Sequence, residues 1–317
     1  MQAIKENILL FGSSYMAEEY LKVIRALDCE VMVVGRDQAK ASQLAEKYKA
    51  VGFGGGVNAL DHISVKEIDL VIIASAVESL AEVACRCLIK GFNRILLEKP
   101  GALGLAGLEK IKSLLKSGHK LGIAYNRRFY NSVIQLRKKI NEDGGPVGCF
   151  FDFTDREKDI LGSVKAKEVV QRWGFANSTH VIDTAFYLAG YPEEMHVLRA
   201  GSFEQHPTGN VFVGCGETPN CLFSYFSTWG GGGRWSVEIS TRKGRYRLSP
   251  MEELQFCQKN QFAWETIVSP DEDDKLYKPG LYKMVSRVLA ENFQDLPTIE
   301  DQIRLCQVTN RIFGYEN

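Results

Sequence analysis

The chain has 317 residues, a length that usually forms two domains and not one core. Its 39 Lys and Arg residues balance its 39 Asp and Glu residues, so the net charge is zero and no basic field attracts nucleic acid or an anionic membrane. With 45% hydrophobic and 25% charged residues, the composition is typical of a protein that buries a sizeable core. We therefore expect neither nucleic acid nor membrane as a partner.

The cysteines and the N-terminus indicate a compartment. No apolar stretch has the roughly 18 to 20 residues of a membrane span, and the N-terminus lacks the apolar region of a signal peptide. The eight cysteines form no C-x-x-C pair, which favours reduced, mostly buried thiols, and the five histidines lack ligand spacing. We expect a cytosolic protein without a metal site.

The first 125 residues alternate short β-branched runs with segments of helical period. This pattern predicts a parallel sheet wound by helices on both faces. Strands are predicted at residues 8–11, 31–34, 70–74, 95–97 and 121–125. We interpret the segment Gly52–Gly56 as a connection and not as a phosphate-binding loop, because no helical pattern opens directly after it.

A different rhythm follows from Asn126 onward. A helix is predicted over 133–140, a strand from about Val147, and a second helix from Val181 to Ala189, with the capping-type residues Asn177 and Ser178 before it. Strand-like runs then occupy about 195–264, followed by an acidic segment at 271–274, which we expect to be a solvated loop, and by helical segments at 278–292 and 300–313.

These patterns define the predicted fold class. It is an α/β protein with an N-terminal Rossmann domain, a doubly wound parallel sheet, over residues 1–125. A C-terminal α/β domain with an open, mainly antiparallel sheet is predicted over residues 126–317, and we assign substrate binding and oligomerisation to it.

The turn after the first strand is a candidate dinucleotide site. Gly12 and Ala17 match the first and last positions of the G-x-G-x-x-G/A template, while Ser14 replaces the middle glycine. Free backbone N–H groups and the positive end of the following helix would bind a pyrophosphate there. The predicted cofactor-binding residues of this turn are Gly12, Ser13, Ser14, Tyr15 and Met16.

The end of the second strand bears on the choice of cofactor. An NAD enzyme normally carries Asp or Glu there, but this chain has Gly35 and Arg36. Gly35 leaves room, and the Arg36 guanidinium suits a 2′-phosphate, so NADP is favoured over NAD, which stays possible. Asp37 argues the other way, and Arg36 could instead be a surface residue beside a turn.

Lys99 stands at the carboxyl end of the strand 95–97, where ligands of parallel sheets gather. The motif Glu98-Lys99-Pro100, the run Tyr125–Phe129 (Tyr-Asn-Arg-Arg-Phe) and a later His180 followed by Asp183 stand together in one chain. In this combination the chain resembles the glucose-fructose oxidoreductase and inositol dehydrogenase family (Gfo/Idh/MocA).

The resemblance implies an NAD(P)-dependent oxidoreductase that acts on sugar-like or other polar hydroxyl and carbonyl compounds. It implies a homo-oligomer, because the open sheet of the family often forms a dimer interface. Lys99 matches the lysine between nicotinamide and substrate, His180 matches the catalytic histidine, and Ser75 stands where the family has the threonine of a Thr-Pro turn. We also place Ser75, Glu98 and Lys99 among the cofactor-binding residues, with Gly35 and Arg36.

The residues around His180 depart from the family. Its position in the first turn of a predicted helix would favour a neutral imidazole, which suits proton transfer. Ala176 occupies the place of the family aspartate, and Asn177 or Asp183 could orient the imidazole instead. This loss makes a non-catalytic dinucleotide- or sugar-sensing protein the alternative function.

Substrate contacts are predicted at Arg127, Trp173, Asn177 and Asp183. Arg127 and Arg128 could each bind a carboxylate or phosphate bidentately, or one of them could hold the domain interface through an ion pair. Trp173 could line the pocket or pack in the core.

Overall fold

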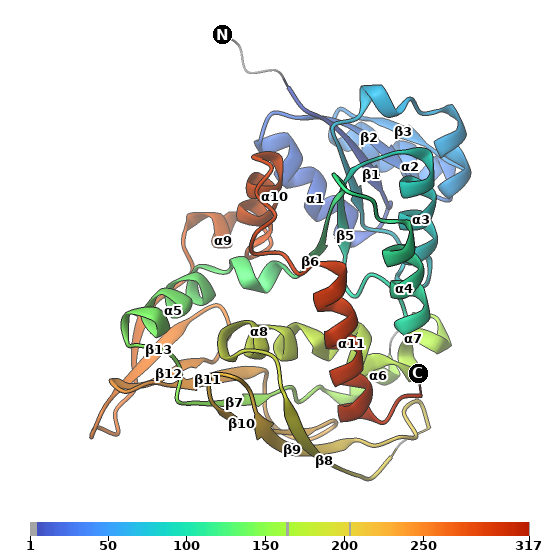
Figure 1. Ribbon diagram of the computed structural model, residues 1–317. Coiled ribbons are helices and arrows are strands. Elements are labelled where there is room, and N and C mark those ends of the chain that lie inside the picture. The colour runs from blue at the N-terminus through green and yellow to red at the C-terminus, as the bar shows by residue number, and fades with distance from the viewer. Residues whose placement is uncertain (1–4, 163–164, 203, 317) are drawn as a thin grey trace. The chain divides into compact units, whose positions relative to one another are not determined.

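The structure is a computed structural model that describes residues 5–162, 165–202 and 204–316. The chain divides into two compact units. Figure 1 shows the chain coloured from blue at the N-terminus to red at the C-terminus. The first contains the residues up to Tyr125 together with Leu276–Ile303, and the second contains Asn126–Lys275 together with the residues from Arg304 on. The units therefore differ from the segments 1–125 and 126–317 at residues 276–303. The assignment of cofactor and substrate binding to those segments stays a prediction.

The first unit is built on a six-stranded parallel sheet in the order β3-β2-β1-β4-β5-β6. Its strands are β1 (Asn7–Phe11), β2 (Glu30–Val34), β3 (Val51–Phe53), β4 (Leu70–Ile73), β5 (Arg94–Glu98) and β6 (Lys120–Ala124). This confirms the predicted Rossmann sheet. Strand β3 is not among the predicted strands, because it lies partly in the segment Gly52–Gly56 that we interpreted as a connection.

Helices cover both faces of this sheet. They are α1 (Tyr15–Ala26), α2 (Gln38–Lys47), α3 (Leu80–Lys90), α4 (Leu105–Leu114) and α10 (Leu281–Leu289), with short 3₁₀ helices at η1 (Gly56–His62), η2 (Val65–Glu67) and η3 (Val77–Ser79). Figure 1 shows α1 beside α10 on one side of the sheet and α3 beside α4 on the other. The Arg94 guanidinium donates to the carbonyls of Val288 and Leu289 at 2.7 and 2.6 Å, which fastens α10 to β5.

The second unit contains an eight-stranded sheet in the order β14-β13-β12-β11-β7-β10-β9-β8. Its strands are β7 (Gly148–Asp152), β8 (Glu194–Ala200), β9 (Val211–Glu217), β10 (Leu222–Thr228), β11 (Ser236–Ser240), β12 (Gly244–Leu248), β13 (Leu254–Gln258) and β14 (Glu265–Val268). The pair β7 and β10 is parallel and the other neighbours are antiparallel. The predicted open, mainly antiparallel sheet is confirmed.

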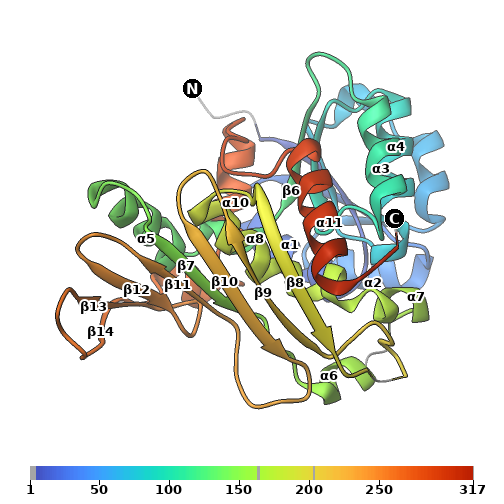
Figure 2. The ribbon, with the colours of Figure 1, turned by 60° about the horizontal axis from the view of Figure 1, so that its bottom comes forward.

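The second unit also contains helices. They are α5 (Asn131–Glu142), α6 (Glu157–Leu161), α7 (Lys167–Gln171), α8 (Thr179–Ala189) and α9 (Glu272–Leu276), with the 3₁₀ helix η4 (Asn126–Phe129) and the π-helical turn η5 (Gly174–Ser178); α11 (Ile299–Phe313) begins in the first unit and ends in the second. Of these helices, α5 and α8 contact the sheet. Helix α8 contacts β7 and β11, and its Phe186 meets Phe151 and Phe223 edge to face. Figure 2 shows the other face of β8, β9 and β10 without a covering helix.

The acidic segment at 271–274 is not a solvated loop. Most of it lies in helix α9, and Asp274 is buried. Its carboxylate accepts a hydrogen bond from the backbone N–H of Asn131 at 2.8 Å, which satisfies a donor at the start of α5. Within the part of the chain that the structure describes, no helix has both the length and the apolar character needed to cross a bilayer.

Candidate functional site

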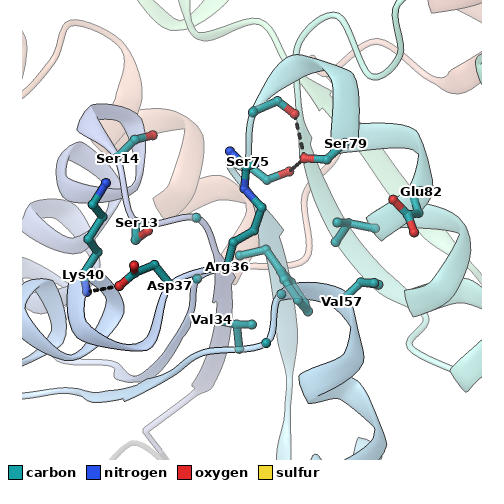
Figure 3. Close-up of a pocket in the computed structure, with 17 residues that line it drawn as sticks. Ser13, Ser14, Val34, Arg36, Asp37, Lys40, Val57, Ser75, Ser79 and Glu82 are labelled. Atoms are coloured by element: carbon teal, nitrogen blue, oxygen red, sulfur yellow. Dashed lines mark hydrogen bonds between the residues drawn. The ribbon is translucent and has the colours of Figure 1, made fainter. Parts of the chain in front are cut away.

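A cavity of about 460 Å³ opens in the first unit where strands β1, β2 and β4 end. Ligands of doubly wound sheets bind at this edge. The lining residues come from four places in the chain: 11–14, 34–37 with Lys40, 55–57, and the stretch with Ser75, Ala76, Ser79, Glu82 and Val83. Figure 3 shows them around one hollow. The cavity therefore brings together Gly12, Ser13, Ser14, Gly35, Arg36 and Ser75 of the predicted cofactor site.

Gly12 is required by the backbone of the first turn. Its φ is +133°, and a Cβ there would lie 2.4 Å from the carbonyl oxygen of Ala74. Ser14, the residue before α1, is extended, and its side chain makes no capping hydrogen bond. The first turn of an α-helix leaves N–H groups without intrahelical partners, and these suit an anion. The turn therefore fits a pyrophosphate, although Ser14 stands in place of the second glycine.

The residues after β2 supply positive charge. A Cβ on Gly35 would lie 2.9 Å from the Ser13 hydroxyl oxygen, so this position too is held close to the first turn. The side chain of Arg36 extends across the cavity between Ser13 and Ser75, and that of Lys40 extends toward Ser14 (Figure 3). The two side chains can therefore approach a phosphate group in this part of the cavity.

Asp37 has a structural partner. Its carboxylate accepts a hydrogen bond from the backbone N–H of Lys40 at 2.9 Å and caps the N-terminus of α2. The carboxylate of Asp37 therefore stabilises the start of α2.

The structure corrects the interpretation of Gly52–Gly56 as a plain connection. A 3₁₀ helix does open at Gly56, and Gly55 and Gly56 form part of the cavity wall. Both have positive φ, at +87° and +57°, and the N–H of Gly56 donates to the Gly35 carbonyl at 2.9 Å. This segment holds the backbone that presents Arg36.

The turn with Lys99 lies at the carboxyl end of β5, outside the residues that line this cavity. The Lys99–Pro100 peptide bond is cis, and Lys99 is half-buried. The amide of Gln302 donates to the Pro100 carbonyl at 3.0 Å, and the Gly101 N–H donates to the Glu98 carbonyl at 2.9 Å. The turn is therefore fixed by its own backbone and by helix α11.

Glu98 is buried beside this turn. Its carboxylate accepts a hydrogen bond from the Tyr20 hydroxyl at 2.7 Å. Burial raises the pKa of Glu98, against the opposite effects of the Tyr20 hydrogen bond and of the charges of Lys99 and Lys278. Tyr15 and Met16, at the start of α1, are likewise outside the cavity lining, and the Lys278 ammonium lies 5.3 Å from the centre of the Tyr15 ring.

His180 in the second unit does not stand at a free helix end. The helical backbone continues upstream of α8 through the π-helical turn Gly174–Ser178. A Cβ on Gly174 would lie 2.5 Å from the Phe313 ring, so this position leaves no room for a side chain. The expectation that a helix N-terminus favours a neutral imidazole therefore does not apply to His180, because this histidine is not in the first turn of the helical run.

Asn177 and Ser178 do not cap the helix. Their side chains donate instead to the carboxylate of Asp155, at 3.2 and 3.0 Å. Asp155 is buried and also accepts from the indole N–H groups of Trp173 at 2.9 Å and Trp235 at 3.1 Å. Burial raises the pKa of Asp155, although these hydrogen bonds act to lower it. No motif in the sequence singles out this carboxylate, which organises the residues ahead of His180.

Asp183 and Arg128 form an ion pair inside the second unit. The guanidinium donates to the two carboxylate oxygens at 2.8 and 2.6 Å, and both side chains are buried. The structure thus places Asp183 in the interior of this unit. Trp173 is also buried, at 5% exposure, with its indole bound to Asp155.

A second cavity, of about 570 Å³, lies within the second unit. It brings together Arg127 and Asn177 of the predicted substrate contacts. Trp235 also lines it, and the His180 ring centre lies 6.1 Å from that of Trp235. Trp173 and Asp183 are not among its lining residues.

The parallel sheet, the glycine turn and the cavity at the strand ends define the first unit as a dinucleotide-binding Rossmann domain. Residues 6–125 match the family described as "Oxidoreductase family, NAD-binding Rossmann fold", the Gfo/Idh/MocA oxidoreductases. For these residues the match confirms the resemblance found in the sequence. A comparison with curated protein sequences gives no match.

Solved structures share the fold over almost the whole chain. UDP-N-acetylglucosamine 3-dehydrogenase GnnA from Acidithiobacillus ferrooxidans is 13% identical with a TM-score of 0.76, covering 98% of each chain. A levoglucosan dehydrogenase in complex with NADH and levoglucosan is 17% identical with a TM-score of 0.78, covering 98% of this chain and 97% of that one. An oxidoreductase from Agrobacterium radiobacter in complex with NAD+, L-tartaric acid and magnesium is 13% identical with a TM-score of 0.78, covering 98% and 96%.

Proposed function

We propose that the protein is an NADP-dependent oxidoreductase that transfers hydride between nicotinamide and a hydroxyl or carbonyl group of a sugar-like substrate. The observation that carries the proposal is the cavity at the ends of β1, β2 and β4 in a domain of an NAD-binding oxidoreductase family. The sugar-like substrate is supported by two similar structures, which are named as dehydrogenases of UDP-N-acetylglucosamine and of levoglucosan.

The preference for NADP is supported by charge. Arg36 and Lys40 are two cations in the part of the cavity next to Gly35, and the carboxylate of Asp37 is used as a helix cap. A guanidinium binds a phosphate through charge-assisted hydrogen bonds, whereas a ribose hydroxyl pair would call for a free carboxylate. Ser13, Ser14 and the first turn of α1 would bind the pyrophosphate.

The catalytic roles are proposed for Lys99 and His180. The bound nicotinamide supplies the hydride acceptor or donor. In the direction of oxidation His180 takes the proton of the substrate hydroxyl, and Lys99 stabilises the negative charge that develops on its oxygen; reduction reverses both roles. Gln302, through the Pro100 carbonyl, acts as a positioning residue for the lysine turn.

The test combines cofactor binding with turnover. NADPH and NADH are titrated by fluorescence, and the oxidation of NADPH is then followed with a panel of sugar-derived carbonyl compounds. Lys99→Met should lower turnover by about 10² or more while NADPH binding stays within a few fold. Lys66→Met, an exposed lysine of the same unit, is the control. Unchanged turnover in Lys99→Met contradicts the role of Lys99.

The same measurements distinguish the oxidoreductase from the alternative, a non-catalytic dinucleotide- or sugar-sensing protein. That alternative is motivated by Ala176, which leaves the family aspartate without a counterpart at its usual position. A single turnover of bound NADPH with any carbonyl compound of the panel excludes a pure sensor. Cofactor binding without any turnover favours it.

We further propose that the protein is a cytosolic homodimer. All eight cysteine thiols are free, which suits a reducing compartment. The uncovered face of the second sheet exposes apolar side chains on adjacent strands, and we call this set the open face: Phe150, Leu198, Val213, Leu222 and Phe226. An apolar sheet face of this kind is typical of an interface between subunits.

A further inference from the structure

The second cavity contains an arginine whose surroundings are aromatic. The Arg127 guanidinium carbon lies 4.7 Å from the ring centre of Trp235 and 5.8 Å from that of Tyr130. Within the part of the chain that the structure describes, its Nε is buried and has no hydrogen-bond acceptor. An N–H group that has lost water without gaining an acceptor is unfavourable until a ligand supplies one.

The ring beneath this arginine is itself held in place. The Trp235 indole N–H donates to the buried carboxylate of Asp155 at 3.1 Å. The loop before Trp235 is anchored at the same residue, because the Gly230 N–H donates to the Asp155 carbonyl at 2.9 Å. Asp155 thus fixes the Trp235 ring, on which the Arg127 guanidinium rests. Binding of a ligand by Arg127 therefore loses little further conformational entropy.

The other charged residues of the cavity wall have both signs: Arg156 and Arg234 lie with Asp155, Asp159 and Glu252. Arg234, next to Trp235, is exposed on the same wall. Two of the three acids there already have protein donors: Asp155 binds two indoles, and Asp159 binds Arg156 at 2.7 Å. Among the described residues, Arg156 is paired with Asp159 and neither Arg127 nor Arg234 has an ion-pair partner, so these two cations can meet a ligand.

The rest of the wall suits hydroxyl groups. Thr154, Asn177 and Glu252 line the same cavity and offer hydroxyl, amide and carboxylate groups. A volume of about 570 Å³ lies within the range of small-molecule sites. The wall thus combines partners for hydroxyl groups with a planar guanidinium that matches two oxygens of one oxyanion.

We propose that the substrate is an anionic polyhydroxy compound, whose carboxylate or phosphoryl group is bound by Arg127 with the help of Arg234. This inference rests on the proposed function, because it names the substrate class of that reaction. It also specifies the part of the substrate that is recognised: the oxyanion lies over Arg127, and the hydroxyl groups lie toward Asn177 and Glu252.

The experiment measures binding and turnover separately. The full-length protein with NADPH present is titrated by calorimetry with three matched compounds, namely glucose, glucuronate and glucose 6-phosphate, and with the same set for galactose and mannose. At least one charged compound should bind about tenfold more tightly than its neutral counterpart, as expected for a charge-assisted hydrogen-bond pair. Whether the uronate or the phosphate binds more tightly identifies the oxyanion as carboxylate or phosphoryl.

Variants then assign the preference to residues. Arg127→Gln should reduce the ratio of charged to neutral affinity from about tenfold to about threefold or less, and Arg234→Gln should lower it less. Arg242→Gln, an exposed arginine in the turn between β11 and β12, should leave the ratio unchanged. Arg234→Gln changes an exposed side chain, so it still tests the proposal if Arg127→Gln does not fold.

The outcomes separate this inference from the proposed function. Equal or weaker binding of every charged compound, or a ratio that Arg127→Gln leaves intact, overturns the anionic substrate. Turnover of neutral sugars alone overturns it too but upholds the oxidoreductase. Tight, Arg127-dependent binding of an anionic sugar without any turnover upholds the inference while the proposed function fails.

Discussion

The Arg128 guanidinium binds the Asp183 carboxylate through two hydrogen bonds, from Nε at 2.8 Å and from a terminal nitrogen at 2.6 Å, across 55 residues of sequence. Asp183 is fully buried and Arg128 is 6% exposed. The pair ties η4, which also carries Arg127, to helix α8, which also carries His180. Arg127 is next in sequence to one member of this buried ion pair, and His180 lies one helical turn from the other. Both residues are proposed to contact the substrate.

Asp183→Asn should therefore destabilise the protein strongly. Removal of one member of a buried ion pair leaves an uncompensated charge, and the expected loss is about 3–5 kcal/mol of unfolding free energy. Urea unfolding followed by circular dichroism measures this loss. Glu272→Gln breaks the exposed pair of Glu272 with Lys275 and should cost less than about 1 kcal/mol. A similar small effect of both substitutions would show that the buried pair contributes little.

Gly12→Ala should remove dinucleotide binding. The substitution forces a side chain into a backbone with φ of +133° and places its Cβ 2.4 Å from the Ala74 oxygen, so the first turn must shift. We expect a loss of more than about 1 kcal/mol in stability and no saturable NADPH fluorescence signal. Gly232→Ala is the matched control, since a Cβ there has no neighbour within 4 Å. Normal NADPH binding by Gly12→Ala would contradict the placement of the pyrophosphate at this turn.

The sequence predicts those parts of the fold that depend on local patterns. The buried run of β4 and the glycine turn before α1 are visible as an apolar stretch and a template. The short strand β3 and the cavity wall at Gly55 and Gly56 are not predicted from the sequence. A glycine-rich segment shows no periodicity from which its contacts could be inferred.

The candidate site was harder to predict, because its supporting contacts join distant residues. Tyr20 meets Glu98 across 78 positions, and Gln302 meets Pro100 across 202. Asp155 accepts hydrogen bonds from Asn177 and Ser178, which lie in the π-helical turn more than twenty residues further along the chain. The residue types were recognisable in the sequence, whereas these pairings are decided by tertiary packing.

Arg36→Ala tests the preference for NADP. Loss of a charge-assisted hydrogen bond to a phosphate should weaken NADPH binding by about ten- to hundredfold, while NADH binding changes little. Fluorescence titrations with both cofactors measure the two dissociation constants. Arg86→Ala, on an exposed part of α3, should change neither. Equal weakening of both cofactors would assign Arg36 to the adenine or ribose that they share.

The environment of Asp143 should make the free energy of unfolding depend on pH. Burial alone would raise its pKa, but hydrogen bonds from Thr241, Lys243 and Tyr246 together hold the pKa of Asp143 below its ordinary value. A carboxyl with a lowered pKa contributes stability above the pKa of the unfolded chain, and this contribution disappears as pH falls through the folded pKa.

Asp143→Asn should therefore cost about 1–3 kcal/mol at pH 7, and the difference from wild type should shrink below about pH 4. Urea unfolding of both proteins from pH 7 downward measures this difference. Asp61→Asn, at an exposed site, is the control and should show no such trend. A difference that stays constant with pH would mean that the carboxylate charge at position 143 is not its source.

Phe226→Asp tests the proposed homodimer. Phe226 is 45% exposed and lies directly opposite Val213 in the register of β10 and β9, while Val213 in turn pairs with Leu198 of β8. A carboxylate in the middle of this open face would have to be desolvated in an interface, so it should shift the protein toward the monomer by tenfold or more in dissociation constant. Light scattering coupled to size-exclusion chromatography measures the mass over a range of concentrations. Phe262→Asp changes another exposed phenylalanine, 97% exposed between β13 and β14 and away from the open face, and should leave the mass unchanged. A wild-type monomer, or a dimer that Phe226→Asp leaves intact, would show that subunits do not meet through this face.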